Sequence, residues 1–355
     1  MRHLRDPRVW ISLAVTGVCF WLALRGVSFA DVARDMARAN LGLLVAVSVP
    51  AHFLSIWLRA VRWRHLTDPI QPIAHGPLFR ATAVGFMANN VIPLRVGEVI
   101  RAWYLAREIG ANGAALFGTV ILERVIDSAV FLGLLGMIVG VYGLRLGAEG
   151  AAYGVPLLVL LSAPMAFVMT LRFWPGSAIR LAGGVVRPLS EPLAVRVEAA
   201  VRSFADGLGA ISRGGHLFWI ALHSVTIWLV TAMVPFWVAI VALDIDLGSL
   251  GRTLAASYVL LTAVGIAVAV PSAPGFFGPY HLACRAALTR FGVPEAQALA
   301  LGTLVHAIFW LSVTALGLAV LRLRRTSLHE LEEHTDVQQL SQAPPVGKDP
   351  QSGRR

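Results

Sequence analysis

Long apolar runs separated by short polar segments dominate this chain. A helix needs roughly 20 mainly apolar residues to cross about 30 Å of hydrocarbon. The runs that meet this requirement lie near residues 9–25, 41–58, 114–141, 153–171, 217–243, 254–270 and 297–321. The pattern therefore predicts an all-α integral membrane protein.

Two further apolar segments are interrupted by residues that break helices. Segment 78–107 contains Asn89, Asn90 and Pro93, and segment 271–290 contains three prolines and two glycines. Non-helical backbone at membrane depth persists only where protein or water satisfies its polar groups. A pair of such segments, one in each half of the chain, is the usual sequence indicator of a transporter binding site.

The placement of arginine predicts the orientation. Arginines precede the first run, follow the second and the last, and six of them occupy residues 172–213, whereas the alternate loops are poorer. The positive-inside rule puts both termini in the cytoplasm. An even number of crossings is then required, so we expect 271–290 to be the eighth crossing and 78–107 to re-enter. The fold class is a polytopic bundle of about eight transmembrane helices with two broken or re-entrant segments.

Three segments are expected to lie outside the hydrocarbon. Residues 28–39 and 193–211 have the periodicity of amphipathic helices that lie on the membrane or on the bundle. Residues 326–355 are polar and predict a disordered cytoplasmic tail, which leaves residues 1–325 as one transmembrane domain.

Composition agrees with this class. The chain is 57% hydrophobic and 14% charged, against about 25% charged residues in a soluble domain. The net charge of +10 could suggest a nucleic-acid partner, but the arginines sit between apolar runs and are better explained as topology signals. We therefore expect no nucleic-acid partner, and the plasma (inner) membrane as the location.

The densest polar constellation is N-N-V-I-P-L-R-V-G-E-V-I-R, residues 89–101. An asparagine at its start can cap a helix with Pro93 in its first turn. Three charged residues then recur at every third position: Arg95, Glu98 and Arg101. If their shared face looks into the bundle, the helix start and two arginines form a site for a phosphate or carboxylate. The alternative is an interfacial helix whose arginines meet lipid phosphates.

The second constellation, E-R-V-I-D, lies within the apolar run 114–141. Glu123 and Asp127 are one turn apart, and Arg124 neighbours Asp127. Ionisable groups inside a span cost roughly 2.5–3.5 kcal/mol each, so they indicate a functional site by default. The alternative is an internal ion pair that clamps helices together.

The third constellation is P-S-A-P-G-F-F-G-P-Y-H, residues 271–281. Its prolines and glycines, among them Pro271, Pro274, Gly275 and Gly278, exclude an ordinary helix. A tight turn between two spans is one interpretation. The other is a re-entrant loop with exposed backbone dipoles and His281 at its end.

Other polar residues receive structural interpretations. Arg59, Arg62 and Trp63 beside Trp57 have the composition of an anchoring belt at the membrane interface. His216 and His223 share a helix face, and we expect no third ligand nearby. We expect no metal site, no cofactor and no assignable catalytic residue, because nucleotide-binding and nucleophile motifs are absent.

Taken together, four motifs resemble the flippase-like membrane family that contains the lysylphosphatidylglycerol synthase transmembrane region. They are R-A-V-R-W-R-H-L (59–66), N-x-x-P-L-R-x-G-E-x-x-R (90–101), E-R-x-x-D (123–127) and P-x-x-P-G-x-x-G (271–278). The resemblance implies a bundle of about eight helices that handles lipids with polar heads. The positions that it implies are Arg59, Arg62, Asn90, Pro93, Arg95, Gly97, Glu98, Arg101, Glu123, Arg124, Asp127, Pro274, Gly275 and Gly278.

The sequence departs from this family in two respects. Phe276 stands where many members have a second glycine, and His281 stands where they have an acidic residue. A mechanism that needs a carboxylate at that position is therefore not expected. The soluble aminoacyl-transfer domain of the family's best-known members is absent as well, so aminoacylation is not expected.

Three functions remain open, and transport is favoured over enzymatic activity. A flippase would bind a phosphate headgroup through Arg95, Arg101 and Arg124, with carboxylates holding the arginines in place. A membrane-embedded transferase would use a buried carboxylate as general base. A non-catalytic protein would partner a lipid- or glycan-modifying enzyme. Membrane lipids are the common partner of all three.

The orientation can be tested by cysteine labelling in intact cells. Cysteines introduced near residue 200 or after residue 326 should be protected from an impermeant thiol reagent, and one near Gly147 should be labelled, because the arginine bias places only Gly147 outside. Labelling at 200 but not at 147 would reverse the orientation.

Overall fold

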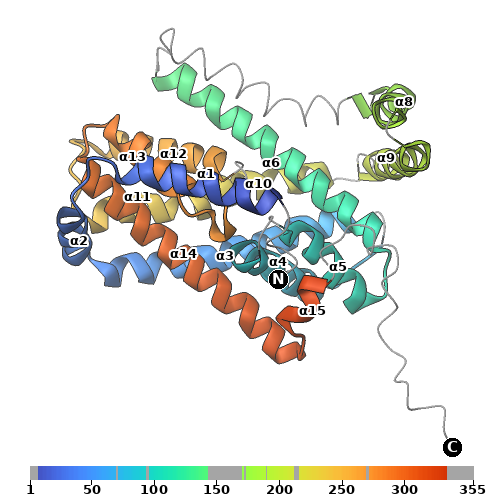
Figure 1. Ribbon diagram of the computed structural model, residues 1–355, viewed down its shortest axis with the longest axis horizontal. Coiled ribbons are helices and arrows are strands. Elements are labelled where there is room, and N and C mark those ends of the chain that lie inside the picture. The colour runs from blue at the N-terminus through green and yellow to red at the C-terminus, as the bar shows by residue number, and fades with distance from the viewer. Residues whose placement is uncertain are drawn as a thin grey trace, which may run out of the picture. The chain divides into compact units, whose positions relative to one another are not determined.

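The computed structural model describes residues 7–68, 71–92, 96–142, 170–171, 173–188, 190–211, 216–268 and 272–333. Regular structure in these ranges is helical, with no strand among them (Figure 1). The helices are α1 (Pro7–Leu24), α2 (Phe29–Arg38), α3 (Leu41–Thr67), α4 (His75–Val91), α5 (Gly97–Ile109), α6 (Gly113–Tyr142), α8 (Pro175–Val186), α9 (Glu191–Ile211), α10 (His216–Thr226), α11 (Val234–Ala242), α12 (Leu250–Ala267), α13 (Pro279–Thr289), α14 (Glu295–Arg324) and α15 (Leu328–Glu333). A π-helical turn, Ile227–Ala232, connects α10 to α11, and a 3-10 turn, Pro274–Phe276, precedes α13.

Polar residues between the apolar runs start several helices. Ser28 accepts a hydrogen bond from the Asp31 backbone N–H (3.4 Å) at the start of α2. Asn40 Oδ1 accepts one from the Leu43 N–H (3.0 Å) at the start of α3. Such side-chain caps satisfy N–H groups that have no partner within their own helix. The chain therefore begins new helices where polar residues interrupt the hydropathy pattern.

Four described helical stretches are long and apolar enough to cross a membrane: Leu41–Thr67, Phe218–Ala242, Leu250–Ala267 and Glu295–Arg324. The count becomes five if Trp10–Leu24 and Phe29–Arg38, which are bent by 81°, form one span. Of the expected span 153–171, only residues 170 and 171 are described. The all-helical class is confirmed, and the count of about eight spans stays a prediction.

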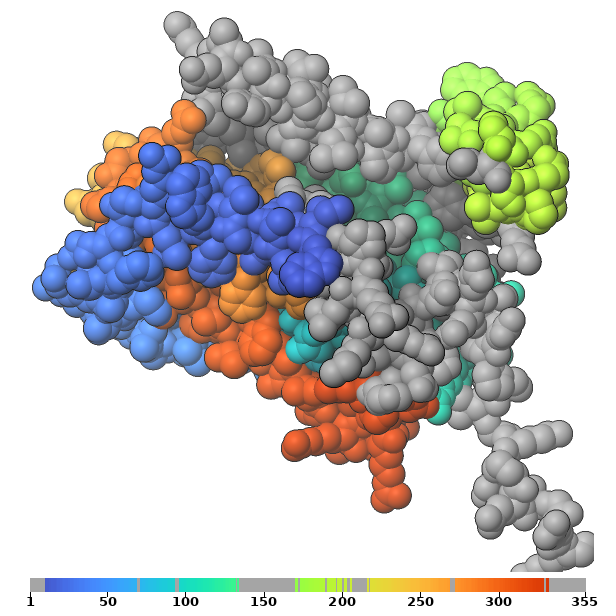
Figure 2. Space-filling view, in the orientation of Figure 1, coloured from blue at the N-terminus to red at the C-terminus, as the bar shows by residue number. Residues whose placement is uncertain are grey.

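The chain divides into two compact units. The first contains residues 1–58, 82–100 and 226–335, and the second contains residues 59–81, 101–225 and 336–355. In the first unit α13 packs against α1, α12 and α14, and Figure 1 shows α1, α12 and α13 side by side. In the second unit α8 packs against α9, and Figure 2 shows their side chains in yellow-green as one adjoining group.

Helices α4 and α5 form an antiparallel pair around the break in segment 78–107. Asn89 Oδ1 accepts a hydrogen bond from the Gly97 N–H (2.9 Å), and Arg80 pairs with Glu108 toward the other ends of the two helices. A Cβ at Gly97 would collide with the Gly85 carbonyl oxygen, so glycine permits this approach. Helix α5 begins at Gly97, which is later than the start that the sequence predicts, and Pro93 lies outside the described ranges. Asn89, at the end of α4, thus provides an acceptor for the Gly97 N–H, which has no partner within α5.

The expected disordered tail also requires a correction at its start. Within residues 326–355 the stretch Leu328–Glu333 forms helix α15, and the Leu331 side chain is fully buried. Ser327 Oγ caps this helix by accepting from the Glu330 N–H (3.2 Å). The buried leucine and the capping serine stabilise this short helix, which the polar composition of the segment did not predict. Residues 334–355 lie outside the described ranges.

Glycine-dependent packing of α14 on α4 gives a stability prediction. A Cβ at Gly317 would collide with Met87 Cβ and lie 3.0 Å from the Ala83 carbonyl oxygen. Overpacking of this kind typically costs about 1–3 kcal/mol. Gly317→Ala should therefore lower the thermal unfolding temperature of the detergent-purified protein.

Gly251→Ala is the matched control, because Gly251 lies in α12 with no heavy atom within 4 Å of an added Cβ. It should be neutral or slightly stabilising, since alanine is the better helix former. Equal unfolding temperatures for the wild type and Gly317→Ala would show that α4 and α14 do not pack this closely.

Candidate functional site

Three helices of the second unit bring a cluster of ionisable side chains together inside the protein. Arg59 and Arg62 come from α3, Arg101 comes from α5, and α6 supplies the remainder. The arginine–carboxylate cluster consists of Arg59, Arg62, Arg101, Glu123, Arg124 and Asp127. All of these are buried except Arg124, whose side chain is 40% exposed. The cluster therefore reaches the surface of the described structure at Arg124.

Glu123 is the centre of the cluster. Its Oε1 atom lies 3.0 Å from Arg101 Nη1, 2.6 Å from Arg124 Nη2 and 3.1 Å from Arg62 Nη2. One carboxylate thus compensates guanidinium groups from three different helices. A buried charge needs this kind of pairing because desolvation of an isolated ion costs several kcal/mol.

Asp127, one turn further along α6, holds the other end of the cluster. Its Oδ1 atom accepts a hydrogen bond from Arg62 Nη1 (2.7 Å), and its Oδ2 atom lies 3.2 Å from Arg124 and 3.7 Å from Arg59. Arg62 Nη1 also donates to Ser224 Oγ on α10 (2.9 Å). Arg62 therefore connects α3 to both α6 and α10.

These contacts bear on two sequence motifs, and a ligand-binding role for E-R-V-I-D stays a prediction beside them. The clamp of helices by internal ion pairs, expected as an alternative for E-R-V-I-D, is present. The anchoring belt is wrong for Arg59, Arg62 and Trp63, since all three are buried. Trp63 Nε1 donates to Thr119 Oγ1 (2.8 Å). Only Trp57, 46% exposed, keeps the exposure that a belt residue needs.

The cluster has capacity for an anion. Its six side chains carry four positive and two negative charges, a net charge of +2. The guanidinium of Arg101 lies 3.8 Å from the centre of the Trp63 ring. Within the described ranges the buried Nε and Nη2 atoms of Arg101, and Nε of Arg62, have no hydrogen-bond partner. Buried donors without an acceptor are uncommon, and a guanidinium fork suits phosphate or carboxylate oxygens.

The remaining residues of segment 89–101 have other surroundings. Asn90 Nδ2 donates to Thr314 Oγ1 on α14 (3.0 Å). Glu98 accepts from Asn89 Nδ2 (3.4 Å), and the carboxylate paired with Arg101 is Glu123 rather than Glu98. Arg101 therefore pairs with a carboxylate on α6 and not with its neighbour three residues earlier on α5. Pro93 and Arg95 lie outside the described ranges, so a role for Arg95 in headgroup binding stays a prediction.

The described part of 271–281 favours a tight turn over a loop with exposed dipoles. Ala273 N–H donates to Thr16 Oγ1 on α1 (2.8 Å), and His306 Nε2 donates to the Gly275 carbonyl oxygen (2.6 Å). Gly278 has φ of +87°, and a Cβ there would lie 2.7 Å from the Thr16 carbonyl oxygen. Its glycine is thus required both by conformation and by contact with α1. Pro271 itself is outside the described ranges.

His281 is buried in the first unit among aromatic rings. Its neighbours within about 6 Å, centre to centre, are Phe20, Phe277, Tyr280 and His306. The arginines of the arginine–carboxylate cluster belong to the second unit. These contacts make His281 part of a packed aromatic core, and headgroup binding by His281 stays a prediction.

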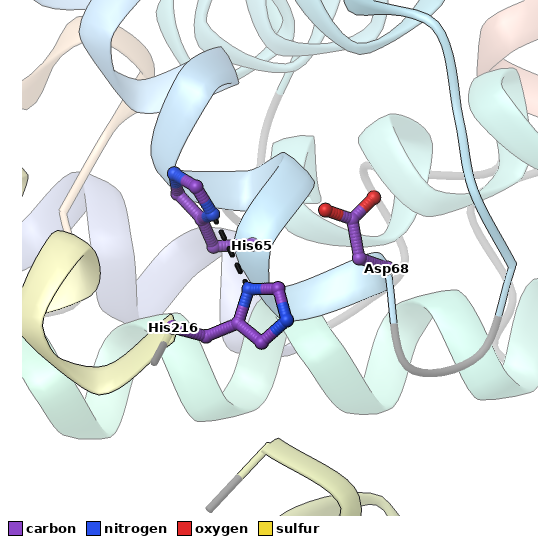
Figure 3. A group of neighbouring side chains, drawn as sticks. All are labelled: His65, Asp68 and His216. Carbon is purple, nitrogen blue, oxygen red and sulfur yellow. Dashed lines mark hydrogen bonds between the residues drawn. The ribbon is translucent and has the colours of Figure 1, made fainter. Parts of the chain in front are cut away.

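The statement that His216 has no further ligand nearby is wrong. His216 Nδ1 lies 3.4 Å from His65 Nδ1, and the ligand atoms of His65, Asp68 and His216 all lie within 4.8 Å of one another (Figure 3). Sequence separation concealed this group, because His65 and Asp68 end α3 whereas His216 begins α10. Ser224 was missed for the same reason, because it is 162 residues from Arg62.

Removing the central carboxylate should destabilise the protein strongly. Glu123→Gln keeps the side-chain shape but leaves three guanidinium groups without this negative charge, and breaking a buried pair typically costs about 3–5 kcal/mol. We expect a large fall in folded yield and unfolding temperature, measured by fluorescence-detected gel filtration after heating.

Glu191→Gln is the control for this prediction. Glu191 pairs with Arg187 (3.1 Å) at the surface, with its side chain 62% exposed. Exposed pairs contribute about 0–1 kcal/mol, so this variant should resemble the wild type. A similarly small effect of Glu123→Gln would contradict the buried cluster.

Comparison with known proteins agrees with the motifs. The family model described as the lysylphosphatidylglycerol synthase TM region matches residues 9–317. Glycosyltransferase AglD of Haloferax volcanii is 24% identical over 336 residues, covering 86% of this chain and 53% of that protein. The chain thus spans about half the length of this curated relative. No solved structure matches the chain. Since the family match covers most of the sequence and the described helices are strongly apolar, the chain is a multi-pass membrane protein that belongs to the family of the lysylphosphatidylglycerol synthase transmembrane region.

Proposed function

We propose that this protein binds the phosphate of a polar-headed lipid, or of a lipid-linked intermediate, at the arginine–carboxylate cluster and moves that lipid between leaflets. The observation that carries the proposal is the set of buried guanidinium donors on Arg62 and Arg101 without a hydrogen-bond partner in the described ranges. The net charge of +2 within the cluster supports the same conclusion. A bound phosphate would supply both the missing acceptors and the missing negative charge.

The geometry suggests how the headgroup would be held. Arg101 presents a planar guanidinium that is stacked on Trp63 at 3.8 Å, so its orientation is already restricted before a ligand binds. Arg124 is 40% exposed and forms the side from which an anion can approach. The acyl or isoprenoid chain of the lipid would stay in the hydrocarbon of the bilayer, because moving it into the protein would not lower its free energy.

Glu123 and Asp127 have positioning roles in this proposal. Each contacts at least two arginines, so each holds guanidinium groups at fixed separations and limits their mutual repulsion. Two carboxylates against four arginines leave the site attractive to an anion. A third carboxylate at this place would cancel part of that attraction.

A transferase is the second candidate, because the relative in Haloferax volcanii is named a glycosyltransferase. That reaction would need a carboxylate able to accept a proton. Glu123 and Asp127 both contact arginines, so each carboxylate already compensates buried positive charge in the cluster. The pairing of both carboxylates with arginines therefore favours lipid transport over a transferase reaction. A non-catalytic partner of a lipid- or glycan-modifying enzyme is the third candidate.

Reconstitution into liposomes tests the proposal. Full-length protein would be incorporated with fluorescent phosphatidylglycerol, and lipid movement followed by quenching of the outer leaflet, with product analysis by mass spectrometry. Accelerated movement without a new product is expected. A new lipid product would identify a transferase, and the absence of both would favour the non-catalytic partner.

Substitution of Arg101 gives a specific prediction. Arg101→Lys keeps one positive charge for Glu123 but removes the planar fork, so fluorescent lipid movement should fall by at least about tenfold at matched expression. The matched control is Arg107→Lys on the same helix, where the guanidinium lies 5.3 Å from the Trp103 ring. This control should retain most activity. Equal activity of the two variants would exclude Arg101 from the headgroup site.

A further inference from the structure

A second group of polar side chains lies at the ends of two helices in the second unit. His65 belongs to the last turn of α3, Asp68 follows that helix directly, and His216 is the first residue of α10. Figure 3 shows the two imidazole rings facing each other through ring nitrogens, with the Asp68 carboxylate to one side. All three residues are only partly buried, so an ion from solution can reach them.

The distance between the two histidines fits a metal ion. A tetrahedral Zn²⁺ ion binds imidazole nitrogens at about 2.0–2.1 Å, which places two such nitrogens about 3.3–3.4 Å apart. The Nδ1 atoms of His65 and His216 are 3.4 Å apart. An oxygen of Asp68 lies within 4.8 Å of a ring nitrogen of each histidine, and a rotation of its side chain could bring it into the first coordination sphere.

The competing interactions at this group are weak. Arg64 Nε lies 3.8 Å from Asp68 Oδ1, and the Arg64 side chain is 53% exposed. An exposed ion pair of this length contributes little, so it does not prevent the carboxylate from turning toward a divalent ion. Without an ion, the two imidazoles can share one N–H···N hydrogen bond at the same distance. That hydrogen bond is the alternative account of the geometry.

We propose that His65, Asp68 and His216 bind a divalent transition-metal ion, with Zn²⁺ as the ion whose ligand preferences they match best. Two imidazole nitrogens and one carboxylate oxygen form a ligand set found in zinc sites that retain an open position. The fourth position would hold water or an external oxygen ligand. This proposal does not depend on lipid transport.

Such a site would also position the helices of the arginine–carboxylate cluster. The ion would join the end of α3 to the start of α10, and the hydrogen bond from Arg62 to Ser224 joins the same two helices (2.9 Å). Arg62 and His65 are three residues apart and neighbour each other on α3, and Asp68 directly follows the helix. Metal binding would therefore hold α3, which carries Arg62, against α10, which carries its hydrogen-bond partner Ser224.

The experiment uses full-length protein purified in detergent without a polyhistidine tag. The protein is treated with a chelator, exchanged into metal-free buffer, incubated with Zn²⁺ and measured for bound metal by mass spectrometry. We expect about one Zn²⁺ per chain. Cobalt added to the chelated protein should give the strong visible absorption of a four-coordinate ion.

Variants locate the ion. His65→Asn and His216→Asn should each weaken Zn²⁺ binding by more than about tenfold, because each removes a direct ligand. His329→Asn, a change in α15, is the control and should bind like the wild type. Binding by both His65→Asn and His216→Asn at the wild-type level would overturn the proposal.

A measurement on the wild-type chain covers the case in which variants fold poorly. Histidines are modified with diethyl pyrocarbonate with and without Zn²⁺, and peptides are mapped by mass spectrometry. Zn²⁺ should protect His65 and His216 but leave His329 unchanged. No protection, together with no bound Zn²⁺, would show that the two rings share only a hydrogen bond. Neither result depends on lipid movement, so failure here is distinct from failure of the transport proposal.

Discussion

Compensation of buried charge is the constraint on which the second unit depends. Glu123 lies inside a strongly apolar chain and contacts Arg62, Arg101 and Arg124 within 3.1 Å. Desolvation makes each of these charges unfavourable alone, so the ions stabilise the protein only when α3, α5 and α6 all stay in contact. The ion pairs thus favour one arrangement of α3, α5 and α6. Apolar side chains of similar size are less specific, because they can pack in several arrangements.

The same constraint connects structure to function. Four guanidinium groups surround two carboxylates, and buried donors on Arg101 lack an acceptor in the described ranges. This excess of positive charge and of donors is the basis of the proposed anion site. The histidine–aspartate group at the end of α3 extends the polar side of that helix beyond Arg62. Both proposed sites therefore depend on how α3 and α10 are held.

In the first unit, close backbone approach at glycines is a second constraint. Gly278 lies against α1, Gly97 allows α5 to approach α4, and Gly317 allows α14 to approach α4. Hydrogen bonds between helices, such as that from Asn90 to Thr314, satisfy polar groups that lipid could not satisfy. The family motifs thus divide into two physical kinds. R-x-x-R and E-R-x-x-D supply paired charges, whereas P-x-x-P-G-x-x-G supplies a turn that only glycine fits.

Sequence alone determined the membrane class, most helix positions, the breaks near residues 92 and 273, and the residue types of the site. Those properties depend on local hydropathy, proline and glycine, which act within one or two turns. Arg59 and Arg62 are three residues apart, and Glu123 and Asp127 are four residues apart. These similar spacings could also have indicated that the two arginines pair with the two carboxylates. Only the tertiary structure decided that Arg62 is buried against Asp127, that Arg101 pairs with Glu123 rather than Glu98, and that His65 meets His216. These partners are 65, 22 and 151 residues apart, and hydropathy carries no information on which helix faces which.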